Sequence, residues 1–329
     1  MKKLTTHTKF LPLQPRIQWN ENSGYCGETS FITAGLSYGQ YLSQYDARGM
    51  ASPGLAQTDG HSQLLLGPGY LGDNDVTAAK AMLLKPWPYD FSTQQDTGAF
   101  LAWVKGQVVR GFPVAIGVLM NAHLFPLDPE KGDDEYDHIV PVYGIGSNNP
   151  LSDPGYYPDD VIYFYDNWVY RPKGDAVNYF HYTFQDFQGT RKEANAGTNR
   201  PYWLVKKKDG VFNYGIALQG LQSDQPTLPV QITTAPDFEC PEMKNTGVRP
   251  DPELLQLFIT VSGLVPGVSY KLYRYNSFTD VPKSHINESA SQAVKSWSIQ
   301  IASGTTWSLA ETILSSEVAV YRAVEASAP

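Results

Sequence analysis

Cys26 is the residue of the chain best placed to act as a nucleophile. It lies in the glycine-flanked stretch 24–27 and precedes an apolar stripe with helical spacing, with Glu28 in the expected first turn. A helix N-terminus lowers the pKa of a thiol and points backbone N–H groups toward an anion. Cys26 is therefore interpreted either as an activated thiol or as a small buried hydrophobic residue.

His138 is the candidate base among the histidines. It opens the run Ile139–Gly144, in which β-branched and aromatic residues predict a strand. Imidazole titrates near neutral pH, so a histidine at the end of a strand can take a proton from a thiol and later return it. The alternative interpretation of His138 is an ordinary surface histidine.

A third polar group follows the next predicted strand, Val161–Tyr165. In the sequence Tyr165-Asp166-Asn167-Trp168, the carboxylate or the amide could hold the second ring nitrogen of the histidine and fix its tautomer. Asp and Asn are also common in the turns that end strands. The pair is therefore either an orienting group or turn chemistry.

The acidic run Asp128–Asp137 precedes the histidine strand. Clustered carboxylates suit hard cations such as calcium, but the spacing matches no calcium-binding loop, and a solvated loop is the favoured interpretation. The expected chemistry needs neither a metal nor an organic cofactor.

Composition limits the classes of protein that this chain can belong to. The 329 residues are 42% hydrophobic and 18% charged, with a net charge of −8, which indicates a globular protein and favours two domains. A basic surface for nucleic acid or anionic membrane is not expected, nor is a membrane-spanning segment. The polar residues after Met1-Lys2-Lys3 give no readable export signal, so the compartment and the oligomeric state stay open.

Two helices and several strands must position the candidate residues, in addition to the helix after Cys26. The first helix is predicted at Val76–Leu84 with Asp75 as its cap, and the second runs from Ser92 to about Gly111. The other predicted elements are strands Phe112–Val118, His138–Gly144 and Val161–Tyr165, a short helix Phe184–Phe187 capped by Thr183, and strand Tyr202–Val205.

From about residue 210 the sequence changes to short strands separated by turns, without a helical period. This spacing predicts an antiparallel β-sandwich, and the turn 264–270 is similar to one in fibronectin type III-like modules. The predicted strands are Tyr214–Leu218, Val230–Thr233, Leu255–Val261, Ser269–Tyr275, Ser296–Ile301 and Val318–Ala323. We therefore expect an α+β fold, with one domain at 1–209 and an all-β accessory domain at 210–329.

The chain order of these motifs resembles the papain-like cysteine peptidases: a cysteine, then a histidine, then an aspartate two residues before Trp168, with a glutamine upstream of the cysteine. The stretch 111–118 before 137–144 resembles the bacteriocin-leader-processing peptidase-like branch more than papain itself. The resemblance covers about residues 14–205.

This resemblance implies a role for each matching residue. Cys26 would be the nucleophile, His138 the general base and acid, and Asp166 the group that orients the imidazole. Gln18 would donate to the oxyanion together with the backbone N–H of Cys26, and Asn22 is the alternative donor because Gln18 lies farther upstream than in papain.

The expected function is hydrolysis of peptide or isopeptide bonds in a protein or peptide substrate. Two alternatives use the same residues differently. In one, the triad transfers the acyl group to an amine or deamidates a side chain. In the other, the papain-like domain is catalytically silent and the β-sandwich binds partners as a scaffold.

Overall fold

The computed structural model describes residues 5–19, 24–67, 74–92, 96–121, 124–125, 138–167, 178–194, 196, 200–206, 213–235 and 247–326. Contacts divide the chain into two compact units. Unit 1 comprises residues 1–15, 64–76 and 86–219, and unit 2 comprises residues 16–63, 77–85 and 220–329. This division differs from the expected boundary after residue 209, because residues 16–63 and 77–85 of the first expected domain belong to the unit that contains the C-terminal strands.

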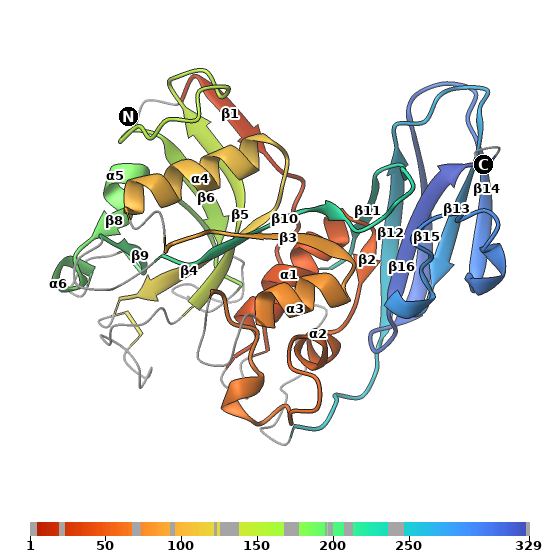
Figure 1. Ribbon diagram of the computed structural model, residues 1–329, viewed down its shortest axis with the longest axis horizontal. Coiled ribbons are helices and arrows are strands. Elements are labelled where there is room, and N and C mark those ends of the chain that lie inside the picture. Colours follow the sequence, from red (N-terminus) through yellow and green to blue (C-terminus); the bar gives the residue numbers. More distant parts are fainter. Residues whose placement is uncertain are drawn as a thin grey trace. The chain divides into compact units, whose positions relative to one another are not determined.

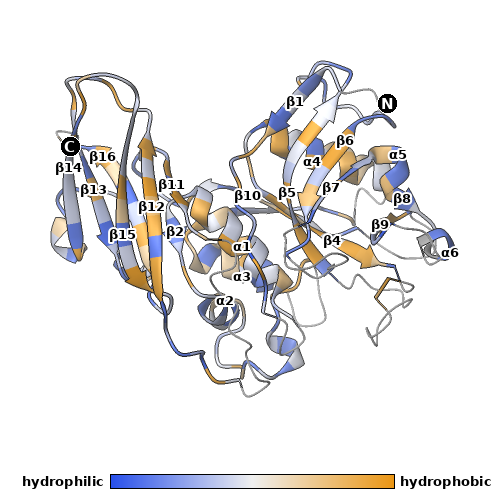
Figure 2. Cartoon of the chain, turned by 180° about the vertical axis from the view of Figure 1, so that it is seen from behind, coloured by the Kyte–Doolittle hydropathy of each residue, from blue (hydrophilic) through white to orange (hydrophobic). Residues whose placement is uncertain are grey.

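Unit 1 is organised by a largely antiparallel sheet in the order β3-β10-β4-β5-β6-β7, with β1 paired to β5, β9 to β4, and β8 parallel to β9 (Figure 1). β4 is apolar and buried at every position, and Figure 2 shows it in orange along most of its length. The strands are β1 (His7–Phe10), β3 (Leu84–Pro88), β4 (Val114–Met120), β5 (His138–Ser147), β6 (Val161–Tyr165), β7 (Tyr179–Thr183), β8 (Gln188–Gly189), β9 (Tyr202–Val205) and β10 (Gly215–Leu221). The start of β3 and the end of β10 belong to unit 2.

The main helix of unit 1 is α4 (Thr97–Val109), which contacts β4 and β5. The Asp96 side chain caps it by accepting from the backbone N–H of Ala99 at 3.1 Å. Its apolar side chains join those of the strands in one core, and a buried ion pair of 2.8 Å connects Lys105 to Asp160 beside that core. The short helices α5 (Phe184–Phe187) and α6 (Arg191–Ala194) follow β7 and β8.

The helices of unit 2 begin at the candidate nucleophile. Helix α1 spans Cys26–Ser37, and α2 (Gln44–Ala51) follows it closely. Ser43 caps α2 by accepting from the backbone N–H of Asp46 at 3.1 Å. Helix α3 (Asn74–Ala81) belongs partly to each unit, and the 3-10 helices are η1 (Gly60–Ser62), η2 (Phe278–Asp280) and η3 (Ala290–Gln292).

Two antiparallel sheets complete unit 2, in the orders β11-β12-β15 and β14-β13-β16-β2. Side chains of the two sheets meet: Arg274 and the Tyr321 hydroxyl both bind Glu311, each at 2.6 Å. The strands are β2 (Gln40–Tyr41), β11 (Val230–Thr233), β12 (Leu254–Ser262), β13 (Ser269–Tyr275), β14 (Lys295–Gln300), β15 (Thr306–Leu314) and β16 (Ala319–Glu325).

The short strand β2 explains why the division of the chain differs from the expected one. It lies between α1 and α2 in the sequence, yet it pairs with β16, with Tyr41 opposite Ala319 and Gln40 opposite Val320. The Tyr41 hydroxyl also donates to the carbonyl of Ser315 at 2.9 Å. The segment that carries Cys26 is therefore built onto a C-terminal sheet.

The coarse fold prediction is confirmed, since the chain is a mixed α+β protein rich in sheet. Asp75 lies inside the first turn of α3 instead of capping it, and the predicted helix stops at Ala81 because Leu84 begins β3. In the part of the chain that the structure describes, no helix is long and apolar enough to span a membrane.

Candidate active site

The backbone turn before α1 places Cys26 as the first residue of the helix, as the sequence predicts. Gly24 has φ +82°, a left-handed conformation that glycine adopts without strain, and Tyr25 is the N-cap. The Cys26 side chain is partly exposed. Backbone N–H groups in the first turn of a helix point out of its N-terminal end, where they favour a thiolate or an oxyanion.

Gln18 is held beside this turn with a defined amide orientation. Its Oε1 accepts a hydrogen bond from the backbone N–H of Tyr25, the residue before Cys26, at 3.2 Å. Because Oε1 is the acceptor in this bond, Nε2 is the donor side of the amide. The structure thus brings together two of the predicted site residues.

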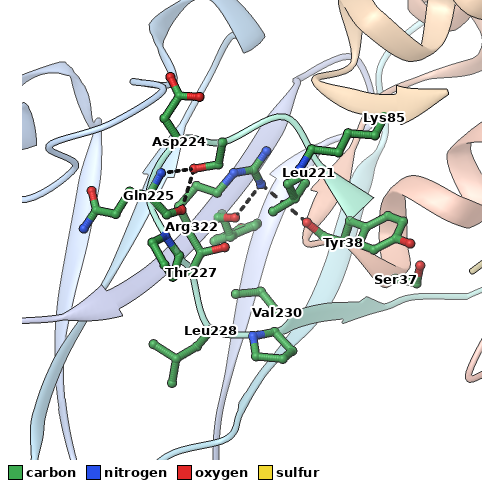
Figure 3. A pocket seen from close by; sticks show the side chains of 14 residues that line it. Ser37, Tyr38, Lys85, Leu221, Asp224, Gln225, Thr227, Leu228, Val230 and Arg322 are labelled. Atoms are coloured by element: carbon green, nitrogen blue, oxygen red, sulfur yellow. Dashed lines mark hydrogen bonds between the residues drawn. The ribbon is translucent and has the colours of Figure 1, made fainter. Parts of the chain in front are cut away.

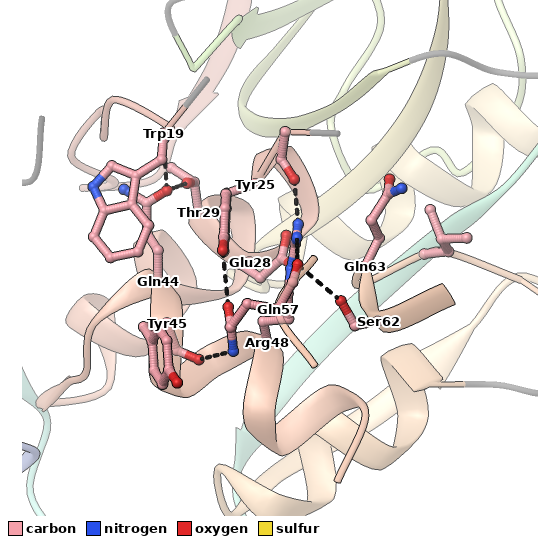
Figure 4. Close-up of polar contacts among 12 residues, drawn as sticks. Trp19, Tyr25, Glu28, Thr29, Gln44, Tyr45, Arg48, Gln57, Ser62 and Gln63 are labelled. Carbon is pink, nitrogen blue, oxygen red and sulfur yellow. Dashed lines mark hydrogen bonds and ion pairs between the residues drawn. The ribbon is translucent and has the colours of Figure 1, made fainter. Parts of the chain in front are cut away.

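Arg48, from α2, connects the turn to the rest of unit 2 (Figure 4). Its buried guanidinium binds the Glu28 carboxylate at 2.6 Å, donates to the carbonyl of Gly24, and donates to that of Gln57 at 3.2 Å. The guanidinium also lies 3.7 Å from the centre of the Tyr25 ring. One buried cation therefore contacts residues on both sides of the start of α1.

A second buried side chain fixes the approach to the turn. The Oε1 of Gln44 accepts from the Trp19 backbone N–H at 2.9 Å and from the Thr29 hydroxyl at 3.1 Å, and its Nε2 donates to the carbonyl of Ile17 at 2.9 Å. These bonds span Gln18 on both sides. We call Gln44, Arg48 and Gln57, with the groups they bind, the turn network.

His138 is the first residue of β5 and is 2% exposed. Its Nε2 lies 2.9 Å from the main-chain carbonyl oxygen of Asp166. A carbonyl oxygen only accepts, so Nε2 carries the hydrogen of the neutral ring, and the basic lone pair is on Nδ1. Burial lowers the pKa of His138 to about 4, which keeps the imidazole neutral at pH 7.

Asp166 does not contact the histidine in the way expected. The imidazole is held by the Asp166 main chain, while the carboxylate accepts a hydrogen bond from the Tyr202 hydroxyl at 3.1 Å. Asn167 has φ +50°, and its Nδ2 donates to the carbonyl of Ile139 at 3.1 Å. This left-handed turn after β6 places the main-chain carbonyl of Asp166 against the start of β5.

Tyr202, from β9, supports both members of this pair. Its ring is stacked with the His138 ring at a centroid distance of 5.5 Å, and its hydroxyl binds Asp166. Stacking against an aromatic ring restricts rotation of the imidazole about its side-chain bonds. Tyr202 is therefore a positioning residue for the candidate base.

The structure groups the predicted residues in two pairs. Gln18 and Cys26 belong to unit 2, and His138 and Asp166 belong to unit 1. Asn22, Trp168, Cys240 and the acidic run 128–137 lie outside the described residues. Within the described ranges, no group of three or more His, Cys, Asp or Glu residues could hold a metal ion.

The sequence patterns do not point to Gln44, Arg48 or Tyr202 as site residues. Tyr202 was predicted only as part of a strand, and the first two lie in a short polar helix without a motif. The sequence does contain one signal for Arg48. Glu28 is expected in the first turn of the helix after Cys26, and a buried carboxylate there needs a cation, which Arg48 supplies.

Comparisons with known proteins find no match. No family model matches the chain, and no curated protein or solved structure is similar to it at a significant level.

Proposed function

We propose that the protein is a cysteine peptidase that hydrolyses peptide or isopeptide bonds in the manner of papain-like enzymes. The observation that carries this proposal is the start of α1, where Cys26 is the first helical residue and the Gln18 amide binds the residue before it. A thiol, outward-pointing N–H groups and an oriented amide donor are the components that acyl transfer through a thioester requires.

The tautomer of His138 is the second support for the proposal. With Nε2–H directed to the Asp166 carbonyl, Nδ1 is the atom that would take the thiol proton. The Cys26 sulfur then attacks the substrate carbonyl, and the developing oxyanion accepts hydrogen bonds from the Gln18 Nε2–H and the Cys26 backbone N–H.

Proton transfers by His138 complete the formation and the hydrolysis of the thioester. His138 Nδ1–H protonates the leaving amine as the carbon–nitrogen bond breaks, which leaves a thioester on Cys26. Water then gives a proton to Nδ1 and its oxygen to the thioester carbon. As the carbon–sulfur bond breaks and the acid is released, Nδ1–H returns the proton to the sulfur and restores the thiol. Asp166 acts here as a positioning residue through its main-chain carbonyl.

The two cysteines of the chain allow a matched labelling test. A peptide with a thiol-reactive electrophile should label the wild type and the Cys240→Ala control equally, and it should not label Cys26→Ala. Turnover on a peptide library, read by product mass, should follow the same pattern, with chains split rather than joined or deamidated. Labelling of Cys26→Ala equal to that of the wild type would show that Cys26 is not the nucleophile.

Gln18 offers a sharper test of the oxyanion donor. Gln18→Glu keeps an oxygen to accept from Tyr25 but removes the N–H donor, whereas Gln18→Ala removes both. Loss of one oxyanion donor costs on the order of 10²- to 10³-fold in kcat. Both variants should show this loss of kcat, while Q18E retains the wild-type Tm. Wild-type kcat in Q18E would mean that another group, such as Asn22, donates to the oxyanion.

A further inference from the structure

A pocket of about 450 Å³ lies in unit 2 (Figure 3), and none of the candidate catalytic residues lines it. The end of α1, Lys85 of β3, the connection between β10 and β11, and β16 contribute its walls. The residues that matter for its chemistry are Arg322, Lys85 and an apolar wall that includes Leu228, Pro229 and Val230.

Arg322 is a buried cation with no carboxylate partner among the described residues. It is 2% exposed, and its Nη1 donates to the carbonyl of Tyr321 at 2.8 Å and more weakly to that of Tyr38 at 3.4 Å. No carboxylate among the described residues lies within ion-pair distance of it, and its Nε and Nη2 donate to none of their atoms. The other N–H groups of a guanidinium are strong donors that favour a bidentate oxyanion.

Two other buried arginines of unit 2, Arg48 and Arg274, show the pairing that such a cation usually has. Arg48 binds Glu28, and Arg274 binds both Glu311 and Glu317 at 2.6 Å. A buried charge is costly unless it is paired, which is why carboxylates accompany those two guanidinium groups. Arg322 has the burial of a paired arginine, but in the described part of the chain no acid forms an ion pair with it.

The groups that surround Arg322 do not compensate its charge. Tyr273 lies opposite it on β13, and Tyr275 and Gln40 flank Val320, so these neutral side chains share its face of the sheet. Burial lowers the pKa of Arg322 to about 10, which still leaves it protonated at neutral pH. Asp224 lines the pocket, but Figure 3 shows its carboxylate pointing away from the guanidinium.

We propose that this pocket binds a small organic anion, with its carboxylate or phosphate group on Arg322 and Lys85 and its apolar body against Leu228, Pro229 and Val230. Lys85 is exposed and makes no ion pair with a described residue, so its ammonium group can close on the ligand. Carboxylate and phosphate both match the fork of a guanidinium. The proposal is independent of catalysis by Cys26.

Four probes separate the head group from the body of the ligand. Calorimetry with the full chain in phosphate-free buffer would use phenyl phosphate, benzoate, inorganic phosphate and benzamide. Phenyl phosphate and benzoate should bind, and the tighter of the two identifies the preferred head group. Benzamide lacks the charge and should bind about tenfold or more weakly, because hydrogen bonds to charged groups are the stronger ones.

Variants assign the binding to the two cations. Arg322→Met should abolish binding of the phenyl anions, and Lys85→Ala should weaken it about threefold to tenfold, since an exposed cation contributes less than a buried one. Lys80→Ala, an exposed lysine of α3 in the same unit that does not line the pocket, is the matched control and should bind like the wild type. Lys85→Ala keeps the test valid where R322M fails to fold.

Three results would overturn the proposal. These are the absence of binding of both phenyl anions to the wild type, benzamide binding as tightly as benzoate, and Lys85→Ala binding indistinguishably from Lys80→Ala. Anion binding that persists in Cys26→Ala separates this site from the proposed peptidase activity, because that variant lacks the nucleophile but retains the pocket.

Discussion

The turn that carries Cys26 and the strand end that carries His138 are stabilised by different interactions. The turn is held by side chains of α2 and the residues after it, which form buried charge-assisted and amide hydrogen bonds to the main chain. The histidine is held by a main-chain carbonyl and by an aromatic ring. The nucleophile side therefore depends on particular polar side chains, whereas the base side depends on backbone geometry and packing.

The largest loss of stability is expected from a substitution in the turn network, on the Cys26 side. Arg48→Ala leaves Glu28 buried without its cation and removes contacts to Gly24 and Gln57, so the free energy of unfolding should fall by about 3–5 kcal/mol. The control is Arg249→Ala, which breaks the partly exposed pair with Asp46 and should cost below about 1 kcal/mol. Urea denaturation measures the free energy of unfolding of both variants. Equal losses in the two would contradict the claim that Arg48 stabilises the turn before α1.

An effect of intermediate size is expected from the pH dependence of His138. The folded pKa of about 4 lies below the unfolded value of about 6.5, so stability present above pH 6.5 is lost as the pH falls. The unfolded chain takes up a proton that the folded protein does not bind, which costs roughly 1.4 kcal/mol per pH unit down to about pH 4.

Denaturation curves between pH 4.5 and 7.5 test this dependence. His138→Gln should remove the part of the slope that belongs to the histidine. If the wild type and H138Q have the same slope, His138 is not buried in its neutral form.

The smallest effect is expected from Asp166→Asn, and it separates the two ways of holding the base. A carboxylate that orients a catalytic imidazole is worth about 10⁴-fold in kcat, whereas a main-chain carbonyl is unchanged by this substitution. Because Asn can still accept from Tyr202, we expect a loss below about tenfold and little change in Tm. A large loss of kcat with intact folding would return the orienting role to the carboxylate.

The elements that the sequence predicts well are those with a strong local signal. Strands β6 and β9 match their predicted bounds, and α1 begins at Cys26, because aromatic and β-branched runs end at clear boundaries and glycines flank the turn. Strand β15 was not predicted, because the buried Glu311 shares a row with Trp307, Leu309 and Ile313 and interrupts the apolar alternation that indicates a strand.

The site was predictable in its residue types but not in its geometry. The pairing of Gln18 with the turn at Cys26 and of Asp166 with His138 follows the predicted groups. The use of a main-chain oxygen in place of a carboxylate depends on the φ of Asn167, which no local pattern specifies. The bonds of Arg48 and Gln44 depend on packing between segments, so composition does not reveal them.

The pairing of β2 with β16 has a consequence for biosynthesis. Tyr41 leaves the ribosome long before Ser315, which follows 274 positions later, yet each is part of the same sheet region. Strand β2, which follows the helix that begins at Cys26, cannot pair with β16 until translation has passed β16. In a nascent chain the segment that carries Cys26 would thus lack its contacts with the C-terminal sheet. A fragment that ends at residue 209 would leave one edge of β2 without its partner strand.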